Sequence, residues 1–182
     1  ENNASRQRLA ALRGQTRTGK WLHEVMLSQN ASRTRFRTNG EDSAGLRGEL
    51  NKAQWTASRE LTGDSLSHSL ALGMQYEQRK FRNFSASFAG ANHRARDQER
   101  SQFIEYLLRA DQRYISVSAR HDNNQRFANL TTWRLTFTQA ITANTRAHAS
   151  WGEGSANPTF FELFGFIPDS FIGNPDLKPE TS

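Results

Sequence analysis

The sequence predicts an all-β fold, an antiparallel transmembrane β-barrel, from three observations. Apolar and polar residues alternate along several segments with the period of two that a strand requires. Short and long connections between these segments alternate along the chain, which is typical of an outer-membrane barrel. Twelve Phe, four Trp and three Tyr occur in a chain whose mean hydropathy is −0.80, so these aromatic side chains need burial in protein or in lipid.

Composition excludes several other classes of protein. The chain has 182 residues, of which 35% are hydrophobic and 23% charged. No window approaches the roughly 18 consecutive apolar residues of a membrane helix, which excludes helical membrane proteins. Four Pro and 12 Gly are too few for a low-complexity disordered chain. Zero cysteines exclude a disulfide scaffold, a thiolate zinc site and a cysteine nucleophile.

Eight strands are expected, at 4–14, 20–34, 45–57, 66–80, 101–110, 113–121, 131–141 and 145–152. The first three have broken alternation, as where Met26 stands between Val25 and Leu27. The fourth places Leu70 and Leu72 on one face, with small or polar residues between them. These four segments read as strands because none carries the apolar spacing of a helix.

The last four strands alternate more cleanly. Their apolar residues are Ile104, Tyr106 and Leu108; Ile115, Val117 and Ala119; Trp133, Leu135 and Phe137; and Ala147, Ala149 and Trp151. Mostly polar residues stand opposite them, with Phe103 and Leu107 as exceptions, and we expect the polar ones of a barrel to line its lumen. The candidate lumen residues are Glu105, Arg120, Asp122, Arg134 and Arg146.

The lengths of the connections and the positions of the tryptophans support a barrel. Short connections are expected at 16–19, 59–65, 111–113 and 142–145, and long ones at 35–44, 81–100, 122–130 and 153–182. A soluble sandwich has no reason to sort its loops in this way. Trp21 and Trp55 fall at the short-turn ends of their strands, and Trp133 and Trp151 at the long-loop ends. Aromatic residues collect in this way at the two interfaces of a membrane.

Catalytic motifs are nearly absent from the sequence. His23 and Glu24 open an HExxH-like string, but Leu27 replaces its second histidine. The segment 152–155 lacks the final glycine of a nucleophile elbow, and no phosphate-binding or dinucleotide-binding fingerprint occurs. The other histidines share no metal-ligand spacing. We therefore expect no enzyme activity, no cofactor and no metal site.

The last part of the chain carries the most specific motif. Residues 151–164 read WGEGSANPTFFELF, and residues 173–182 read GNPDLKPETS. This pattern resembles the TonB-dependent outer-membrane receptors. The matching residues are Gly152, Pro158, Glu162, Leu163, Phe164, Asn174, Pro175, Leu177, Pro179, Glu180 and Ser182. Asn157 departs from the pattern, since many members have Ala before the Pro. Pro158, Pro168, Pro175 and Pro179 fix the backbone outside a sheet, so we expect the motif to shape a loop.

A second stretch resembles the same family. Arg120, Asp122, Asn123, Asn124, Phe127 and Trp133 occur in the order of a strand end, a short loop and a Trp-led strand. The spacing looks particularly like the cobalamin receptors, although siderophore receptors share most of it. The resemblance is strong over about 101–182 and only architectural over 1–100.

The resemblance implies a place for the chain in a larger assembly. Residues 1–182 would be part of one receptor barrel of about 22 strands, without the plug domain and the remaining strands. Both ends look like truncation points. The implied location is the bacterial outer membrane, in contact with its lipid and lipopolysaccharide. The implied function is TonB-energised uptake of a ferric siderophore or cobalamin, with TonB contacting a plug segment.

The charge of the chain adds further candidates. The net charge is +6, yet the 24 cations are scattered rather than clustered, so no nucleic-acid partner is expected. Arg94, Arg96 and Arg100 fall in an expected long loop, as do Phe166 and Phe171, which makes these five the candidate ligand-loop residues. Outer cations could also pair with lipopolysaccharide phosphate or attract an anionic ferric chelate.

Three rival interpretations remain open at this point. Eight strands could close into a small outer-membrane barrel with a structural or adhesion role. Against this, the chain finishes with 30 residues outside the expected strands. Alternatively, the chain could be a soluble β-sandwich that binds polyanions with a steep salt dependence. An enzyme is a third and weaker alternative.

Overall fold

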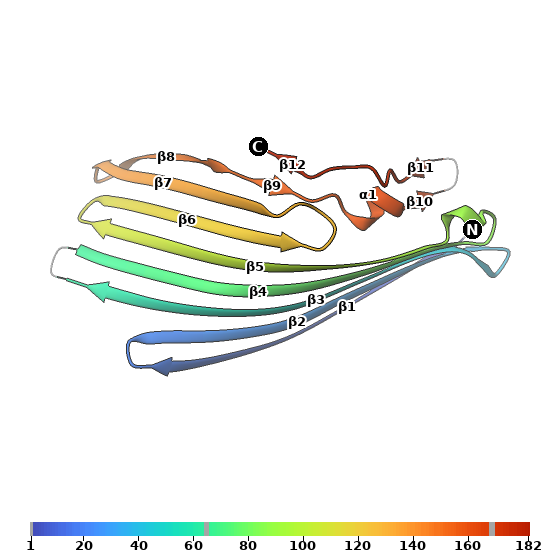
Figure 1. Ribbon diagram of the computed structural model, residues 1–182, viewed down its shortest axis with the longest axis horizontal. Coiled ribbons are helices and arrows are strands. Elements are labelled where there is room, and N and C mark those ends of the chain that lie inside the picture. Colours follow the sequence, from blue (N-terminus) through green and yellow to red (C-terminus); the bar gives the residue numbers. More distant parts are fainter. Residues whose placement is uncertain (1, 64–65, 168–169) are drawn as a thin grey trace.

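The fold is one antiparallel sheet whose eight strands follow each other in chain order (Figure 1). The computed structural model describes residues 2–63, 66–167 and 170–182. The strands are β1 Asn2–Thr18, β2 Trp21–Thr38, β3 Glu41–Thr62, β4 Leu66–Ser85, β5 His93–Ala110, β6 Arg113–Asn124, β7 Leu130–Thr142 and β8 Thr145–Glu153. The predictions of an all-β class, antiparallel pairing and eight strands are confirmed.

The sheet is open. Within the described residues, β1 pairs only with β2 and β8 only with β7, so these strands form two free edges. The eight strands therefore do not close into a small barrel of their own. They also form one sheet rather than the two packed layers of a sandwich, so both rival folds are wrong for this chain.

The two faces of the sheet have opposite character. One face, which we call the polar face, carries most of the buried residues of the sheet, and these are Gln75, Asn83, Ser85, Asp97, Glu99, Ser101 and Asn124. The other face, the apolar face, leaves large hydrophobic side chains exposed, including Leu12 at 69%, Met74 at 57% and Trp151 at 72%. A sheet in a soluble protein buries its apolar face and exposes its polar face. This sheet does the opposite, and we call it inverted.

Cross-strand pairing makes the apolar residues contiguous. Leu70, Tyr106, Val117, Leu135 and Trp151 are successive partners across β4 to β8. Side chains of paired residues lie on the same face, about 4.5–5.5 Å apart at Cβ. The result is a belt of apolar side chains, which alternate along each strand with residues of the polar face.

The strands are longer than the sequence predicted at one end of the sheet, which we call the loop end. The expected long loop 35–44 is wrong, because β2 and β3 join through Asn39 and Gly40 alone. Their positive φ values, 54° and 85°, suit a tight hairpin turn. The expected loop 81–100 shrinks to residues 86–92, which contain the short 3-10 helix η1 Ala89–Ala91. Pairing with neighbouring strands extends β4 and β5 through segments that show no hydrophobic alternation.

The opposite end, the turn end, carries tight connections. β1 and β2 join through residues 19–20, β5 and β6 through 111–112, and β7 and β8 through 143–144. The expected connection 59–65 is too long, because β3 continues to Thr62. Consequently Trp55 lies inside β3, paired with Val25 and Met74, and not at the strand end.

The remaining tryptophans lie closer to the ends of their strands. Trp21 is the first residue of β2 at the turn end. Trp133 and Trp151 lie near the loop end of β7 and β8, with ring centroids 5.2 Å apart in an edge-to-face arrangement. Register places these residues on the apolar face. Two aromatic rims are therefore only partly present, since Trp55 sits within the belt.

The chain beyond β8 forms a compact loop beside the loop end. Its elements are β9 Ser155–Ala156, α1 Phe160–Phe164, β10 Phe166–Ile167, β11 Phe171–Ile172 and β12 Glu180–Thr181. β9 pairs with β12 and β10 pairs with β11, so the segment folds back on itself. Pro168, expected as a corner of this loop, lies outside the described residues. No helix in the described part of the chain is long and apolar enough to cross a membrane.

Candidate functional site

The C-terminal loop, residues 153–182, packs its helix against the polar face of the sheet. Phe164 of α1 stacks on His93 of β5 with ring centroids 4.0 Å apart. Phe160 lies 6.1 Å from Phe81 of β4, measured between ring centroids. The guanidinium carbon of Arg126 lies over both aromatic rings of the helix. It is 5.1 Å from the ring centroid of Phe164 and 5.6 Å from the ring centroid of Phe160. These contacts fix the loop over the loop end of β4 and β5.

A capping box defines where α1 begins. The hydroxyl of Thr159 accepts a hydrogen bond from the backbone N–H of Glu162, and the carboxylate of Glu162 accepts one from the backbone N–H of Thr159 at 2.7 Å. Each group satisfies a backbone donor that a helix start leaves free. These hydrogen bonds to the charged form hold the pKa of Glu162 below its ordinary value.

Two glycines allow the chain to pass close behind α1. A Cβ on Gly165 would meet the carbonyl oxygen of Phe161 at 2.4 Å, and one on Gly173 would meet the backbone N of Phe164 at 2.6 Å. This close approach lets Gly173 N–H donate to the carbonyl of Gly165 at 2.8 Å. Leu163 is packed beneath this turn and is only 2% exposed.

The motif GNPDLKPETS closes the loop. Asn174 N–H donates to the carbonyl of Glu162 at 2.8 Å, and the Asn174 side-chain oxygen accepts from the N–H of Asp176 at 3.0 Å. At the far end, Ser182 and Gly154 exchange two backbone hydrogen bonds of 3.0 Å. Pro175, Leu177 and Pro179 span the stretch between these anchors, and Glu180 pairs with Ala156. Pro158 directly precedes the cap residue of α1. The matched residues thus mainly contact one another.

A charged network lies on the polar face beside the C-terminal loop. Glu99 is its centre and is 6% exposed. Its carboxylate accepts hydrogen bonds from Asn124 at 2.9 Å, Asn157 at 3.2 Å and Arg79 at 3.4 Å. Arg120 lies 4.0 Å from the same carboxylate. Asn157 therefore ties the C-terminal loop to the sheet, at the position where the sequence departs from the pattern that it resembles.

The network extends to both sides of Glu99. Asn124 also donates to Asp97 at 3.1 Å, and Arg79 pairs with Glu77 at 2.9 Å. Sequence reasoning missed Asp97 and Glu99 because it placed the start of β5 in a loop, and it did not single out Glu77, which lies inside the expected strand 66–80. All three stand at odd-numbered positions of β4 and β5, which the strand register places on one face of the sheet. This alternation was the signal that could have found them.

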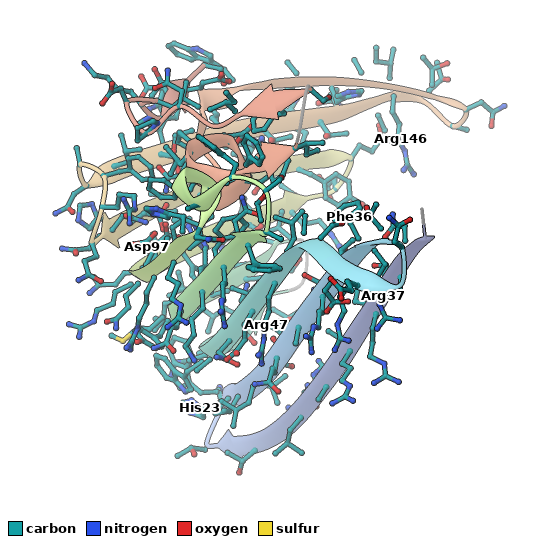
Figure 2. The ribbon with its side chains drawn as sticks, turned by 90° about the vertical axis from the view of Figure 1, so that its right-hand side faces the viewer. His23, Phe36, Arg37, Arg47, Asp97 and Arg146 are labelled. Atoms are coloured by element: carbon teal, nitrogen blue, oxygen red, sulfur yellow. The ribbon has the colours of Figure 1, made fainter. Side chains whose placement is uncertain are left out.

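The structure places the five candidate lumen residues on the polar face. Arg120 donates to Asp122 at 2.8 Å and to the hydroxyl of Ser101 at 2.7 Å. Arg146 extends from β8 on the same side as the interior of the curved sheet (Figure 2). Glu105, Arg134 and Arg146 form no ion pair within the described residues. Of the two candidate carboxylates, Asp122 thus pairs with an arginine, and Glu105 does not among the described residues.

The candidate ligand-loop residues separate into two groups. Arg94, Arg96 and Arg100 lie within β5 on the apolar face, not in a loop, because β5 begins at His93. They therefore face away from the C-terminal loop and the network. This corrects the expected grouping of these arginines with Phe166 and Phe171.

Phe166 and Phe171 do lie in the C-terminal loop. Phe171 stacks on Phe161 at 4.8 Å, and Phe166 lies 5.0 Å from Phe88, both measured between ring centroids. Phe166 also lines a hollow of about 590 Å³, together with Phe36, Leu46 and Asn83. Phe36 lies on the opposite side of the β2–β3 tip from Arg37 (Figure 2). The hollow joins the loop to the polar face at the loop end.

The chemistry of these groups suits binding rather than catalysis. Among the described residues, no group of three or more His, Cys, Asp or Glu side chains is placed to hold a metal ion. The charges of the network are mostly paired with each other. The hollow offers two aromatic rings and an amide, which can contact a large, partly apolar ligand.

Known proteins show the same architecture. A family model described as "TonB dependent receptor-like, beta-barrel" matches residues 2–182. A vitamin B12 transporter, BtuB, from Photobacterium profundum is 28% identical over 162 residues, which cover 87% of this chain and 24% of the relative. BtuB of Vibrio vulnificus is 32% identical over 117 residues, or 62% of this chain and 18% of that protein. The chain thus spans about a quarter or less of these relatives.

Solved structures agree on the fold. The siderophore receptor PirA from Acinetobacter baumannii superposes with a TM-score of 0.79 at 15% identity, over 100% of this chain and 32% of that one. PirA from Pseudomonas aeruginosa gives 0.80 at 13% identity, over 98% of this chain and 34% of that one. In both, this chain corresponds to about a third of the larger chain.

Proposed function

Since the chain belongs to the TonB-dependent receptor β-barrel family, we propose that it forms part of the wall of a bacterial outer-membrane receptor that imports a scarce, large ligand. The inverted sheet is the observation that carries this proposal. An exposed apolar face and a buried polar face suit a wall between lipid and a filled lumen. The family consists of receptors and transporters, so no catalytic role is proposed.

The two ends of the sheet give the wall a direction. Short turns belong on the periplasmic side of such barrels and longer loops on the extracellular side. The loop end, with the C-terminal loop and the hollow beside Phe166, would therefore face the medium. The polar face would line the lumen, where the network around Glu99 would contact a plug domain or the passing ligand. Energy would come from TonB acting on a plug segment.

Cobalamin is the first candidate ligand, because the relatives found by sequence are vitamin B12 transporters. A ferric siderophore is the second candidate. It rests on the structural neighbours, whose 13–15% identity supports the fold alone. Both ligands are large and partly apolar, which fits the aromatic hollow at the loop end.

Uptake by cells that carry the full-length gene tests the proposal. Deleting the gene should abolish uptake of radiolabelled cyanocobalamin at nanomolar concentration, and deleting tonB should do the same. Loss of ⁵⁵Fe-siderophore uptake instead would select the second ligand. Unchanged uptake of both classes in the deletion strain would contradict the proposed function.

The hollow can be tested separately. Replacing Phe36 and Phe166 with Ala in the full-length receptor should weaken ligand binding about tenfold, since large aromatic contacts dominate binding energy. Phe137→Ala on the apolar face is the control, because this ring lies away from the hollow. Equal binding by both variants would remove the hollow from the ligand path.

A further inference from the structure

The tip of the β2–β3 hairpin brings together two groups that can react with each other. Asn39 and Gly40 alone form the turn between Thr38 and Glu41. Of all the asparagines in the chain, Asn39 is the only one that is followed by glycine. Because glycine has no Cβ, its backbone nitrogen can be approached closely. The side-chain amide of Asn39 therefore stands next to an unhindered nitrogen of its own main chain.

Both groups are open to solvent. Asn39 and Gly40 are exposed, and a Cβ built on Gly40 would meet nothing within 4 Å. Within the described residues, neither the side chain of Asn39 nor the N–H of Gly40 makes a hydrogen bond. No contact therefore holds the amide in place or shields the nitrogen from it.

The backbone of the tip allows the two groups to approach. Asn39 has a φ of 54°, in the left-handed region, and must rotate about its Cα–C bond to bring the Gly40 nitrogen to its side chain. The register of β2 against β3 shifts between Phe36 and Arg37, directly below the tip. Such an irregularity interrupts the ladder of backbone hydrogen bonds. The rotation therefore disturbs only the short end of the hairpin above the shift.

We propose that Asn39 is a site of spontaneous deamidation, with the Gly40 nitrogen as the nucleophile and water as the co-reactant. The Gly40 nitrogen loses its proton and forms a bond to the side-chain carbonyl carbon of Asn39. The bond from that carbon to the amide nitrogen breaks, and ammonia leaves with a proton from water. Water then opens the resulting succinimide ring. Opening at the backbone carbonyl carbon leaves isoaspartate, in which the main chain runs through the former side chain.

Other asparagines of the chain lack this combination. Asn174 precedes Pro175, whose nitrogen has no proton to lose. Asn144 is exposed in the turn between β7 and β8, but the β-branched Thr145 follows it and crowds the nitrogen. The reaction should therefore select Asn39.

Isoaspartate at this position would open the hairpin tip. It adds a methylene group to the main chain of a tight turn, whose twist otherwise matches that of the flanking strands. Phe36 lies just below the tip and lines the hollow together with Phe166 (Figure 2). Loss of the turn would displace Phe36, so the modified receptor would bind its ligand more weakly. This last step rests on the proposed function.

Ageing of the full-length receptor in detergent tests the proposal. Purified protein is incubated at pH 6 and at pH 8.5 in water enriched in oxygen-18, then digested and read by mass spectrometry. The peptide that contains Asn39 should lose its amide and take up oxygen-18, and faster at the higher pH because the Gly40 nitrogen must lose a proton. Conversion should be at least about tenfold faster than at Asn144, where the following residue is β-branched.

Asn39→Gly is the matched variant, because glycine suits the left-handed position and keeps the turn but carries no amide. Aged wild type should become a substrate for an isoaspartate methyltransferase, and its amide hydrogens at 36–44 should exchange faster than those of fresh protein. Aged Asn39→Gly should show neither change.

Three outcomes would overturn the proposal: no loss of the amide at Asn39, equal conversion at Asn144, or exchange at 36–44 that is the same in aged and fresh wild type. These readouts do not require a ligand. Failure of the fresh receptor to bind any ligand would contradict the proposed function and would leave the mass and exchange measurements to decide this proposal.

Discussion

Gly152 lies where β8 approaches β7 so closely that no larger residue fits. A Cβ at this position would meet the carbonyl oxygen of Trp133 at 2.3 Å and the Cα of Arg134 at 2.8 Å. Because both neighbours are backbone or Cα atoms, relief requires the strands to separate. This explains in physical terms why the motif begins with glycine.

Gly152→Ala should therefore lower the free energy of unfolding of the full-length receptor by about 1–3 kcal/mol, the usual cost of overpacking. Gly14→Ala is the control, since a Cβ there would meet nothing within 4 Å. Urea unfolding followed by tryptophan fluorescence measures both. Equal midpoints for the two variants would show that the β7–β8 contact is looser than described.

Glu99 is the buried centre of the charged network on the polar face. Glu99→Gln keeps the shape of the side chain but removes the charge that Arg79 and Arg120 face. Hydrogen bonds to a charged group contribute about 1.5–3 kcal/mol each, so we expect a loss of unfolding free energy of that order. Glu105→Gln on the same strand is the control, because Glu105 is exposed. Unfolding midpoints that match between the two variants would contradict a structural role for the network.

At the scale of elements, the capping box makes the C-terminal loop sensitive to acid. The folded pKa of Glu162 is lowered, so its contribution to loop stability is present above the ordinary value of 4.5 and is lost as the pH falls through the lowered value. Wild-type receptor should resist proteolysis within 153–182 at pH 7 and become susceptible in the acid range below that ordinary value.

Glu162→Gln should remove this pH dependence, because the amide does not titrate. Glu153→Gln, which changes an exposed carboxylate at the first residue of the loop, should retain it. Cleavage by pepsin and thermolysin between pH 3 and 7, read by mass spectrometry, measures the effect. A protection profile that is identical in wild type and Glu162→Gln would exclude the capping box as its cause.

The strands could be predicted from the sequence over part of their length only. Alternation identified the eight strands where one face is apolar, as at Ile104 and Val117, and it placed the connections 111–113 and 142–145 within a residue of the observed turns. It failed at the loop end, because both faces are polar there, as in the run from Asp97 to Arg100, and the period of two disappears. Pairing with neighbours keeps such segments in the sheet. The dipeptide Asn39-Gly40 was the available signal for a tight hairpin.

The candidate site could likewise be predicted only in part. The motif of the C-terminal loop was readable because it is local, and its capping box joins residues three apart. The network around Glu99 was not readable, since it joins residues from β4, β5, β6 and the loop. Its members meet only through strand register, which the sequence leaves open where alternation is lost.

At the scale of the whole molecule, the inverted sheet unites these observations. Exposed leucines, valines and aromatic residues form one continuous face, while carboxylates and amides are buried on the other. In water such a sheet would expose its apolar face to solvent and leave two free edges. In a closed barrel within a bilayer, both the face and the edges are satisfied.

The most direct test of this account is the lipid exposure of successive residues along β5. The segment has no cysteine, so single cysteines can be placed from residue 103 to residue 108 of the full-length receptor and labelled with a fluorophore. Brominated lipid should quench the label strongly at 104, 106 and 108 and weakly at 103, 105 and 107. Quenching that is uniform along the strand, or strongest at the odd positions, would contradict the assignment of the apolar face to the membrane.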